Sequence, residues 1–79
     1  MTLHDSKVAK MEDQLDQEVI GRIGRVTLGI TPQHAGEVVV AIRGGTESFA
    51  ALCDEPVAKN TRVVVIEYLS GRTVSVTPC

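Results

Sequence analysis

The chain contains several short runs of β-branched residues separated by residues that favour turns, and this pattern constrains the fold more than any other feature. Val63-Val64-Val65-Ile66 is the clearest run and predicts a strand over residues 61–68. Similar runs predict strands at residues 26–30, 37–43, 46–52 and 73–77. Five strands in about 60 residues, with a turn signal every 8–12 residues, indicate an all-β domain.

Turn residues mark the ends of these strands. Pro32 cannot donate a backbone hydrogen bond, so the first strand should stop before it. Gly44-Gly45 predicts a two-residue hairpin, because both positions tolerate a positive φ. Asn60 accepts a left-handed backbone and predicts a turn before the fourth strand. Ser70-Gly71 and Pro78 bound the last strand.

The pattern within the strands predicts which faces are buried. The block Val38-Val39-Val40-Ala41-Ile42 is too continuous for a strand with one face in water, so it should cross the core. Residues 73–77 alternate polar and apolar residues, as expected of a half-buried edge strand. The sequence does not decide which face of residues 46–52 points inward. Glu47, Phe49 and Ala51 share one side, which is not clearly more apolar than the other.

The length of 79 residues allows one domain, and a chain this small has few ways to enclose a core. A flat sheet containing residues 63–66 would expose an aggregation-prone edge, whereas closing the sheet removes that edge. The core must be mainly aliphatic, because the chain has one Phe, one Tyr and no Trp. We therefore expect a small five-stranded barrel, closed or nearly closed, rather than a two-layer sandwich.

Residues 1–18 are polar and acidic, with five acids against two lysines and neither glycine nor proline. Val8, Met11, Leu15 and Val19 have the spacing of one helix face, and Asp5 or Ser6 could cap such a helix. A helix this short is marginal on its own, and a linker is the alternative that the composition of chain ends favours. We expect an acidic linker or short helix over residues 1–18 and the barrel domain over residues 19–79.

The charge distribution excludes a broad attraction to nucleic acid or anionic lipid. The net charge is −2, and residues 19–79 hold six bases and five acids. No apolar run approaches the roughly 20 residues of a membrane helix, and no apolar segment near residue 1 indicates secretion. Cys53 and Cys79 are too few for a disulfide scaffold, which favours a reducing compartment, and a bridge between them requires the ends of the third and fifth strands to approach.

No group of residues has the spacing of a catalytic, metal or phosphate site. A triad needs a base near a nucleophile, and the only histidines are His4, in the terminal segment, and His34, in a loop. The serines stand in no elbow motif: Ser6, Ser48, Ser70 and Ser75. His4, His34, Cys53 and Cys79 lack the short spacing of zinc ligands. We expect no enzymatic activity, no cofactor and no metal.

Two glycine-containing segments could suggest phosphate binding. They are Gly21-Arg22-Ile23-Gly24-Arg25 and Arg43-Gly44-Gly45, and neither precedes the helix start that supplies an amide cradle. Glycines in a curved barrel strand more often mark places where the sheet bends. We therefore expect Gly21 and Gly24 to be structural.

The order of short motifs over residues 20–78 resembles the C-terminal domain of the NfeD family. The motifs are Ile20-Gly21-Arg22-Ile23-Gly24-Arg25-Val26, Pro32, Gly36-Glu37-Val38, Gly45, Phe49-Ala50, Arg62-Val63-Val64-Val65 and Val74-Ser75-Val76-Thr77-Pro78. Two features depart from the family's pattern: Asn60 stands where the family often has glycine, and the turn at residues 31–36 is about as long as the longest turn expected there. The resemblance implies a five-stranded OB-fold Greek-key barrel that acts as an interaction module.

The same resemblance implies a cellular role. Family members carry transmembrane helices upstream of the barrel, and longer ones add a ClpP-like serine protease domain before them. NfeD proteins are partnered with stomatin, prohibitin or flotillin-like membrane scaffolds and are implicated in the regulation of membrane proteases and in membrane quality control. The resemblance therefore implies a membrane-associated protein whose soluble domain faces the cytoplasm, with the acidic segment as the stalk.

The alternative function is binding of single-stranded oligonucleotides, which many OB barrels achieve by stacking bases on aromatic residues over a basic groove. Here only Phe49 and Tyr68 could stack, so this reading is disfavoured and no nucleic acid partner is expected. Five arginines could still cluster on one face: Arg22, Arg25, Arg43, Arg62 and Arg72. For a protein partner, the interface could include the loop at residues 33–35 or the connection at residues 54–56, and the sequence favours neither.

Overall fold

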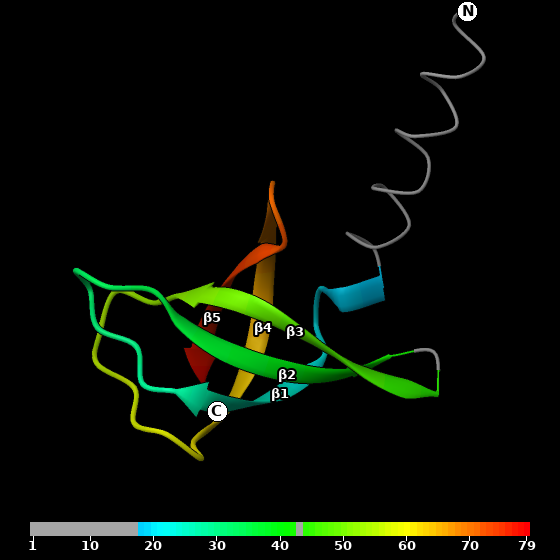
Figure 1. Ribbon diagram of the computed structural model, residues 1–79, viewed down its shortest axis with the longest axis horizontal. Helices are drawn as coiled ribbons and strands as arrows, with labels where there is room; N and C mark the ends of the chain where they lie inside the picture. Colours follow the sequence, from blue (N-terminus) through cyan, green and yellow to red (C-terminus); the bar gives the residue numbers. More distant parts are fainter. Residues whose placement is uncertain (1–17, 43) are drawn as a thin grey trace, which may run out of the picture.

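The computed structural model describes residues 18–42 and 44–79, which form a five-stranded all-β domain (Figure 1). The strands are β1 (Ile23–Leu28), β2 (Gly36–Ile42), β3 (Gly45–Leu52), β4 (Arg62–Leu69) and β5 (Thr73–Pro78). The expectation of a five-stranded barrel is confirmed. The prediction of a linker or helix over residues 1–18 lies outside the described residues, except at its last position.

The strands close into a barrel in the order β1-β2-β3-β5-β4, and β4 pairs with β1 to complete it. All neighbouring pairs are antiparallel except β3 and β5, which run parallel. This arrangement is consistent with an OB fold. The prediction that β5 is an edge strand is wrong, because β5 is hydrogen-bonded to β3 on one side and to β4 on the other.

The core is aliphatic and is filled from the inner face of every strand. Its fourteen buried hydrophobic residues are Val19, Val26, Ile30, Val38, Val40, Ile42, Phe49, Ala51, Cys53, Val57, Val63, Val65, Val74 and Val76. No polar or charged residue among the described residues is buried. With nine valines and one aromatic ring, the interior is built from side chains that suit a pleated surface.

The prediction that β2 crosses the core with neither face in water is wrong. Val38, Val40 and Ile42 are buried, whereas Val39 is half-buried and Ala41 is exposed. A single barrel has one core on one side of its sheet, so each strand has an inner and an outer face even where its sequence is continuously apolar.

The burial pattern also settles the inward face of β3. Phe49 and Ala51 are buried, while Glu47 occupies the same alternation but is exposed. The first residues of β3 pair with the end of β2 in a hairpin that extends beyond the core (Figure 1). Alternation therefore identifies the face, and position along the strand decides whether that face is covered.

Strand β1 begins at Ile23, three residues before the predicted start, and ends at Leu28. Its early start includes Gly24, whose backbone approaches β2 so closely that an added Cβ would lie 2.8 Å from the Val39 carbonyl oxygen. Gly24 is therefore structural, as predicted, although its role is close approach between strands. Ile30 lies beyond the strand and exchanges two 2.9 Å backbone hydrogen bonds with Val57.

The turns agree in part with those predicted from the sequence. Asn60 has φ of 74°, the left-handed conformation predicted for it. Gly44 has φ of 74°, while Gly45 already belongs to β3 and has no positive φ. Arg72 also has a positive φ, which the sequence did not indicate.

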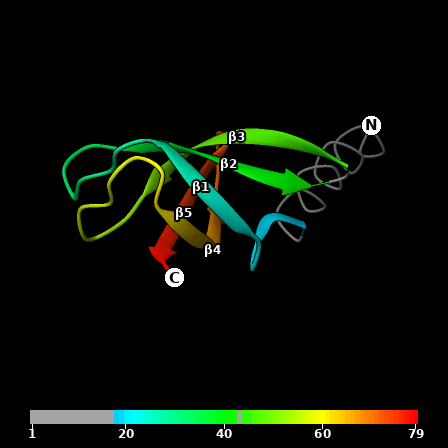
Figure 2. The ribbon, with the colours of Figure 1, turned by 90° about the horizontal axis from the view of Figure 1, so that it is seen from below.

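The Ile30–Val57 pair joins the β1–β2 loop to the β3–β4 connection at one end of the barrel. These two segments lie side by side in both views of the ribbon (Figures 1 and 2). The chain enters at the opposite end through Glu18 and Val19, which have helical backbone, with Val19 fully buried. The two loops that were separate interface candidates in the sequence are therefore parts of one end, which we call the loop end.

Candidate interaction surface

The structure places the candidate catalytic and metal residues apart. His34 is exposed in the β1–β2 loop, where its backbone exchanges hydrogen bonds of 3.0 and 3.1 Å with Thr31. Cys53 is buried and Cys79 is exposed, and both are free cysteines. His4 and Ser6 lie outside the described residues. No nucleophile and base come together among these residues in the part of the chain that the structure describes.

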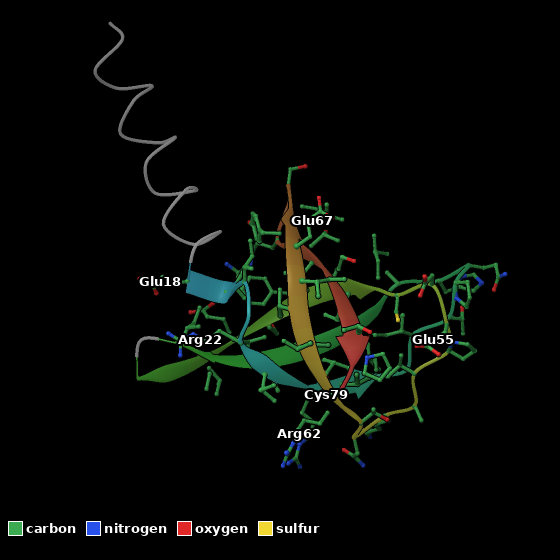
Figure 3. The ribbon with its side chains drawn as sticks, turned by 180° about the vertical axis from the view of Figure 1, so that it is seen from behind. Glu18, Arg22, Glu55, Arg62, Glu67 and Cys79 are labelled. Carbon is green, nitrogen blue, oxygen red and sulfur yellow. The ribbon has the colours of Figure 1, made fainter. Side chains whose placement is uncertain are left out.

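One close set of metal-ligating atoms was missed by the sequence reasoning. The Sγ atom of Cys53 and carboxylate oxygens of Asp54 and Glu55 lie within 4.8 Å of one another. The three residues are consecutive, and the two acids are exposed at the loop end (Figure 3). Their proximity follows from chain connectivity, and the only signal in the sequence is their adjacency.

The chain's only two aromatic residues are engaged in the barrel itself. Phe49 is buried, and its ring meets the ring of Tyr68 edge to face at 6.3 Å between centroids. The Arg72 guanidinium lies 4.9 Å from the Phe49 centroid and donates a 2.7 Å hydrogen bond to Glu47 Oε1. Neither ring is free to serve as an open platform for bases.

The outer face of β3, β5 and β4 carries an open groove of about 410 Å³, which we call the bulge groove. Leu52 and Ile66 form its apolar part, and they are 39% and 53% exposed. Ser75 of β5 is paired with Leu52 on one side and with Glu67 on the other. The groove is lined by Pro32, Leu52, Cys53, Asp54, Ile66, Ser75, Val76 and Thr77.

A β-bulge in β4 lies at this surface. The pairing of β4 with β5 shifts register between Val65 and Glu67, so two residues of β4 span one step of β5. Without the shift, strict alternation would direct Glu67 inward; with it, Tyr68 packs against the core and Glu67 is exposed. Ile66 lies on the outer face, as alternation from the buried Val65 requires, and it is the more exposed residue of the groove's apolar pair.

Both loops that the sequence offered as interface candidates border the bulge groove. Asp54 comes from the β3–β4 connection, and Pro32 from the β1–β2 loop directly precedes residues 33–35. Sequence reasoning missed Leu52 and Ile66, because an apolar residue in a strand is normally assigned to the core. An outward position in the alternation was the available signal for both, because Leu52 follows the buried Ala51 and Ile66 follows the buried Val65.

A second open groove, of about 360 Å³, lies on the outer face of β1 and β2. We call it the arginine groove, since Arg25 and Arg62 are its charged residues. The groove is lined by Ile23, Gly24, Arg25, Val39, Ala41, Thr46 and Arg62. Among the five arginines considered as a cluster, the structure brings these two together, while Arg72 belongs to the Phe49 contact and Arg43 lies outside the described residues.

Comparison with known protein families assigns the barrel to a family. The model of the NfeD C-terminal domain matches residues 23–77, which include β1 to β4 and all of β5 except Pro78. The chain belongs to the NfeD C-terminal domain family. The resemblance seen in the sequence is thereby confirmed.

Two solved structures are similar to this chain in fold and in sequence. The soluble domain of the NfeD protein YuaF from Bacillus subtilis superposes with a TM-score of 0.80 at 29% identity, covering 98% of this chain and 92% of that one. The C-terminal domain of stomatin operon partner protein 1510-C from Pyrococcus horikoshii gives a TM-score of 0.65 at 29% identity, covering 81% and 92%. A search by sequence among curated proteins returned no match. Among the described residues, no helix has the length and apolar character required to cross a membrane.

Proposed function

We propose that this NfeD C-terminal domain is a non-catalytic interaction module that docks a membrane scaffold protein of the stomatin, prohibitin or flotillin class through the bulge groove. The observation that carries the proposal is the pair Leu52 and Ile66, two large apolar side chains exposed on one outer face beside a loop that can contact a partner. Exposed apolar surface bordered by polar residues is typical of protein interaction sites.

The comparisons support the class of partner. A similar structure is that of a stomatin operon partner protein, which links such a domain to a stomatin operon. By the family's pattern, the barrel is attached to a membrane through a transmembrane region upstream, faces the cytoplasm and contributes to regulation of a membrane protease and to membrane quality control. The barrel supplies the contact to the scaffold, and the catalytic step belongs to the protease.

The oligonucleotide alternative loses its main physical support. Stacking contributes about 1–3 kcal/mol per base in proteins that bind single strands. Phe49 is buried and Tyr68 packs against it, so the chain's only two rings are occupied within the barrel.

Co-purification with a stomatin-class scaffold from the same source tests the proposal. Leu52→Asp and Ile66→Asp should each lower recovery of the scaffold strongly, because a carboxylate would be desolvated in the contact. Leu28→Asp is the matched control, since Leu28 is 59% exposed but lines neither groove. Equal recovery by all three variants and the unaltered chain would contradict the proposal, as would steeply salt-dependent binding of a single-stranded oligonucleotide that the Asp variants leave intact.

A further inference from the structure

The arginine groove contains an arrangement that is unfavourable in the isolated barrel. Arg25 of β1 and Arg62 of β4 are directly paired across the two strands, and like charges in this position repel each other. The ion pair found among the described residues joins Arg72 to Glu47 elsewhere. Figure 3 shows Arg62 projecting away from the barrel. Neither Arg25 nor Arg62 donates a side-chain hydrogen bond to a described residue, so two cations are presented together to an incoming anion.

Apolar surface adjoins the two cations. Ile23 is 50% exposed, Ala41 is exposed and Val39 is half-buried. Gly24 also lines the groove, and its close approach to the Val39 carbonyl oxygen holds β1 and β2 together there. The groove therefore suits a peptide that carries carboxylates next to an apolar stripe, because the carboxylates can neutralise the arginines while the stripe covers Ile23 and Ala41.

The chain contains one segment with this chemistry, residues 5–17. It holds four acids against two lysines: Asp5, Glu12, Asp13 and Asp16 against Lys7 and Lys10. Val8, Met11 and Leu15 recur at spacings of three and four, which places them on one face if the segment is helical. A helix of this length is marginal in water unless an apolar surface covers its stripe.

The entry of the chain into the barrel favours a contact between two molecules. Val19 is fully buried, and the Arg22 side chain donates a 3.0 Å hydrogen bond from Nε to the Glu18 carbonyl oxygen, which holds the entry in place. Glu18 and Arg62 lie at different edges of the barrel in Figure 3. A segment supplied by a second copy is not bound by this entry and can approach Arg25 and Arg62 from outside.

We propose that the arginine groove binds residues 5–17 of a second copy of this chain. Each copy then donates its acidic segment and accepts its partner's, which gives a symmetric dimer with two identical contacts. Asp13 and Asp16 are the acids nearest Leu15 in the sequence, and we assign their carboxylates to Arg25 and Arg62. The bulge groove lies on a different face and stays open in this dimer.

The dimer dissociation constant of the full chain, measured by sedimentation equilibrium, tests the proposal. Arg25→Glu with Arg62→Glu should raise it at least about tenfold, and so should Asp13→Lys with Asp16→Lys, because each exchange turns attraction into repulsion in both contacts. The second variant alters no described residue, so its effect does not depend on the stability of the barrel. Lys59→Glu, at an exposed base outside both grooves, should leave the constant unchanged.

Mixing the two charge-reversed chains gives the decisive result. A heterodimer pairs each altered groove with an altered segment and each original groove with an original segment, so dimerisation should return although neither variant dimerises alone. Contact within one molecule cannot be restored by mixing. A chain that is monomeric at all protein and salt concentrations, or a mixture that stays monomeric, overturns the proposal; so does a dimer that neither pair of substitutions weakens.

Discussion

The two grooves occupy outer faces of one small barrel but arise in different ways. The bulge groove lies at an irregularity, the register shift between Val65 and Glu67 that leaves Ile66 and Glu67 both on the outer face. The arginine groove depends on regular pairing, which sets Arg25 opposite Arg62 and leaves Ile23 beside them. A closed sheet thus offers two chemically distinct surfaces over one core, and each can be altered without the other.

Deletion of Ile66 should cause the largest loss of stability among the changes that test these two grooves. Without the extra residue, Glu67 and Tyr68 would keep their places opposite Ser75 and Val74, but β4 would lose the local bend and added twist that the bulge gives it within the closed barrel. We expect a loss of at least about 3 kcal/mol in the free energy of unfolding, measured by urea denaturation. Ile66→Ala keeps the bulge and is the control, with an expected loss below about 1 kcal/mol because the side chain is exposed. Equal losses in both variants would show that the bend of the bulge does not contribute to the stability of the closed barrel.

Gly24→Ala should disturb the arginine groove and spare the bulge groove. An added Cβ would lie 2.8 Å from the Val39 carbonyl oxygen and 3.1 Å from a methyl group of Val40, so β1 and β2 must separate slightly. We expect a loss of about 1–3 kcal/mol in the free energy of unfolding. Backbone amide shifts should change in β1 and β2 and remain unchanged at Leu52 and Ser75. Changes of similar size in both grooves would show that the two faces are mechanically coupled.

Salt should affect binding at the arginine groove and at the bulge groove to different extents. Raising ionic strength from about 0.05 M to about 0.5 M shortens the screening length severalfold. It should weaken dimerisation through Arg25 and Arg62 while leaving the Leu52 and Ile66 contact with a scaffold nearly constant. Sedimentation and co-purification at the two salt concentrations measure the two effects. An equal response of both contacts would contradict the assignment of charge to one groove and apolar contact to the other.

Glu47→Ala should have the smallest effect, because it removes an exposed ion pair that lines neither groove. Its 2.7 Å contact to Arg72 joins two side chains that are each about half exposed. Such pairs contribute about 0–1 kcal/mol, and salt screens them. We expect a small loss in urea denaturation at low salt that vanishes at high salt, with both binding activities intact. A loss beyond about 2 kcal/mol would indicate that the pair is needed to hold Arg72 over the Phe49 ring.

The sequence alone determined the number of strands, the aliphatic core and the family, because each depends on local preference or on the order of short motifs. Asn60 is an example, since only a few residue types adopt a left-handed backbone readily, and it does so here. The closure of the sheet could also be expected, because an open edge beside residues 63–66 would favour aggregation.

Only the tertiary structure decided which strands are neighbours and which side chains reach the surface. The parallel pairing of β3 with β5 joins residues about twenty positions apart and removes the edge that alternation in β5 had suggested. The register shift at Ile66 and the pairing of Arg25 with Arg62 have no local signature, because register is set by how all strands share one core. The strands of this protein were therefore readable from its residues, whereas its two surfaces depend on contacts between residues distant in the chain.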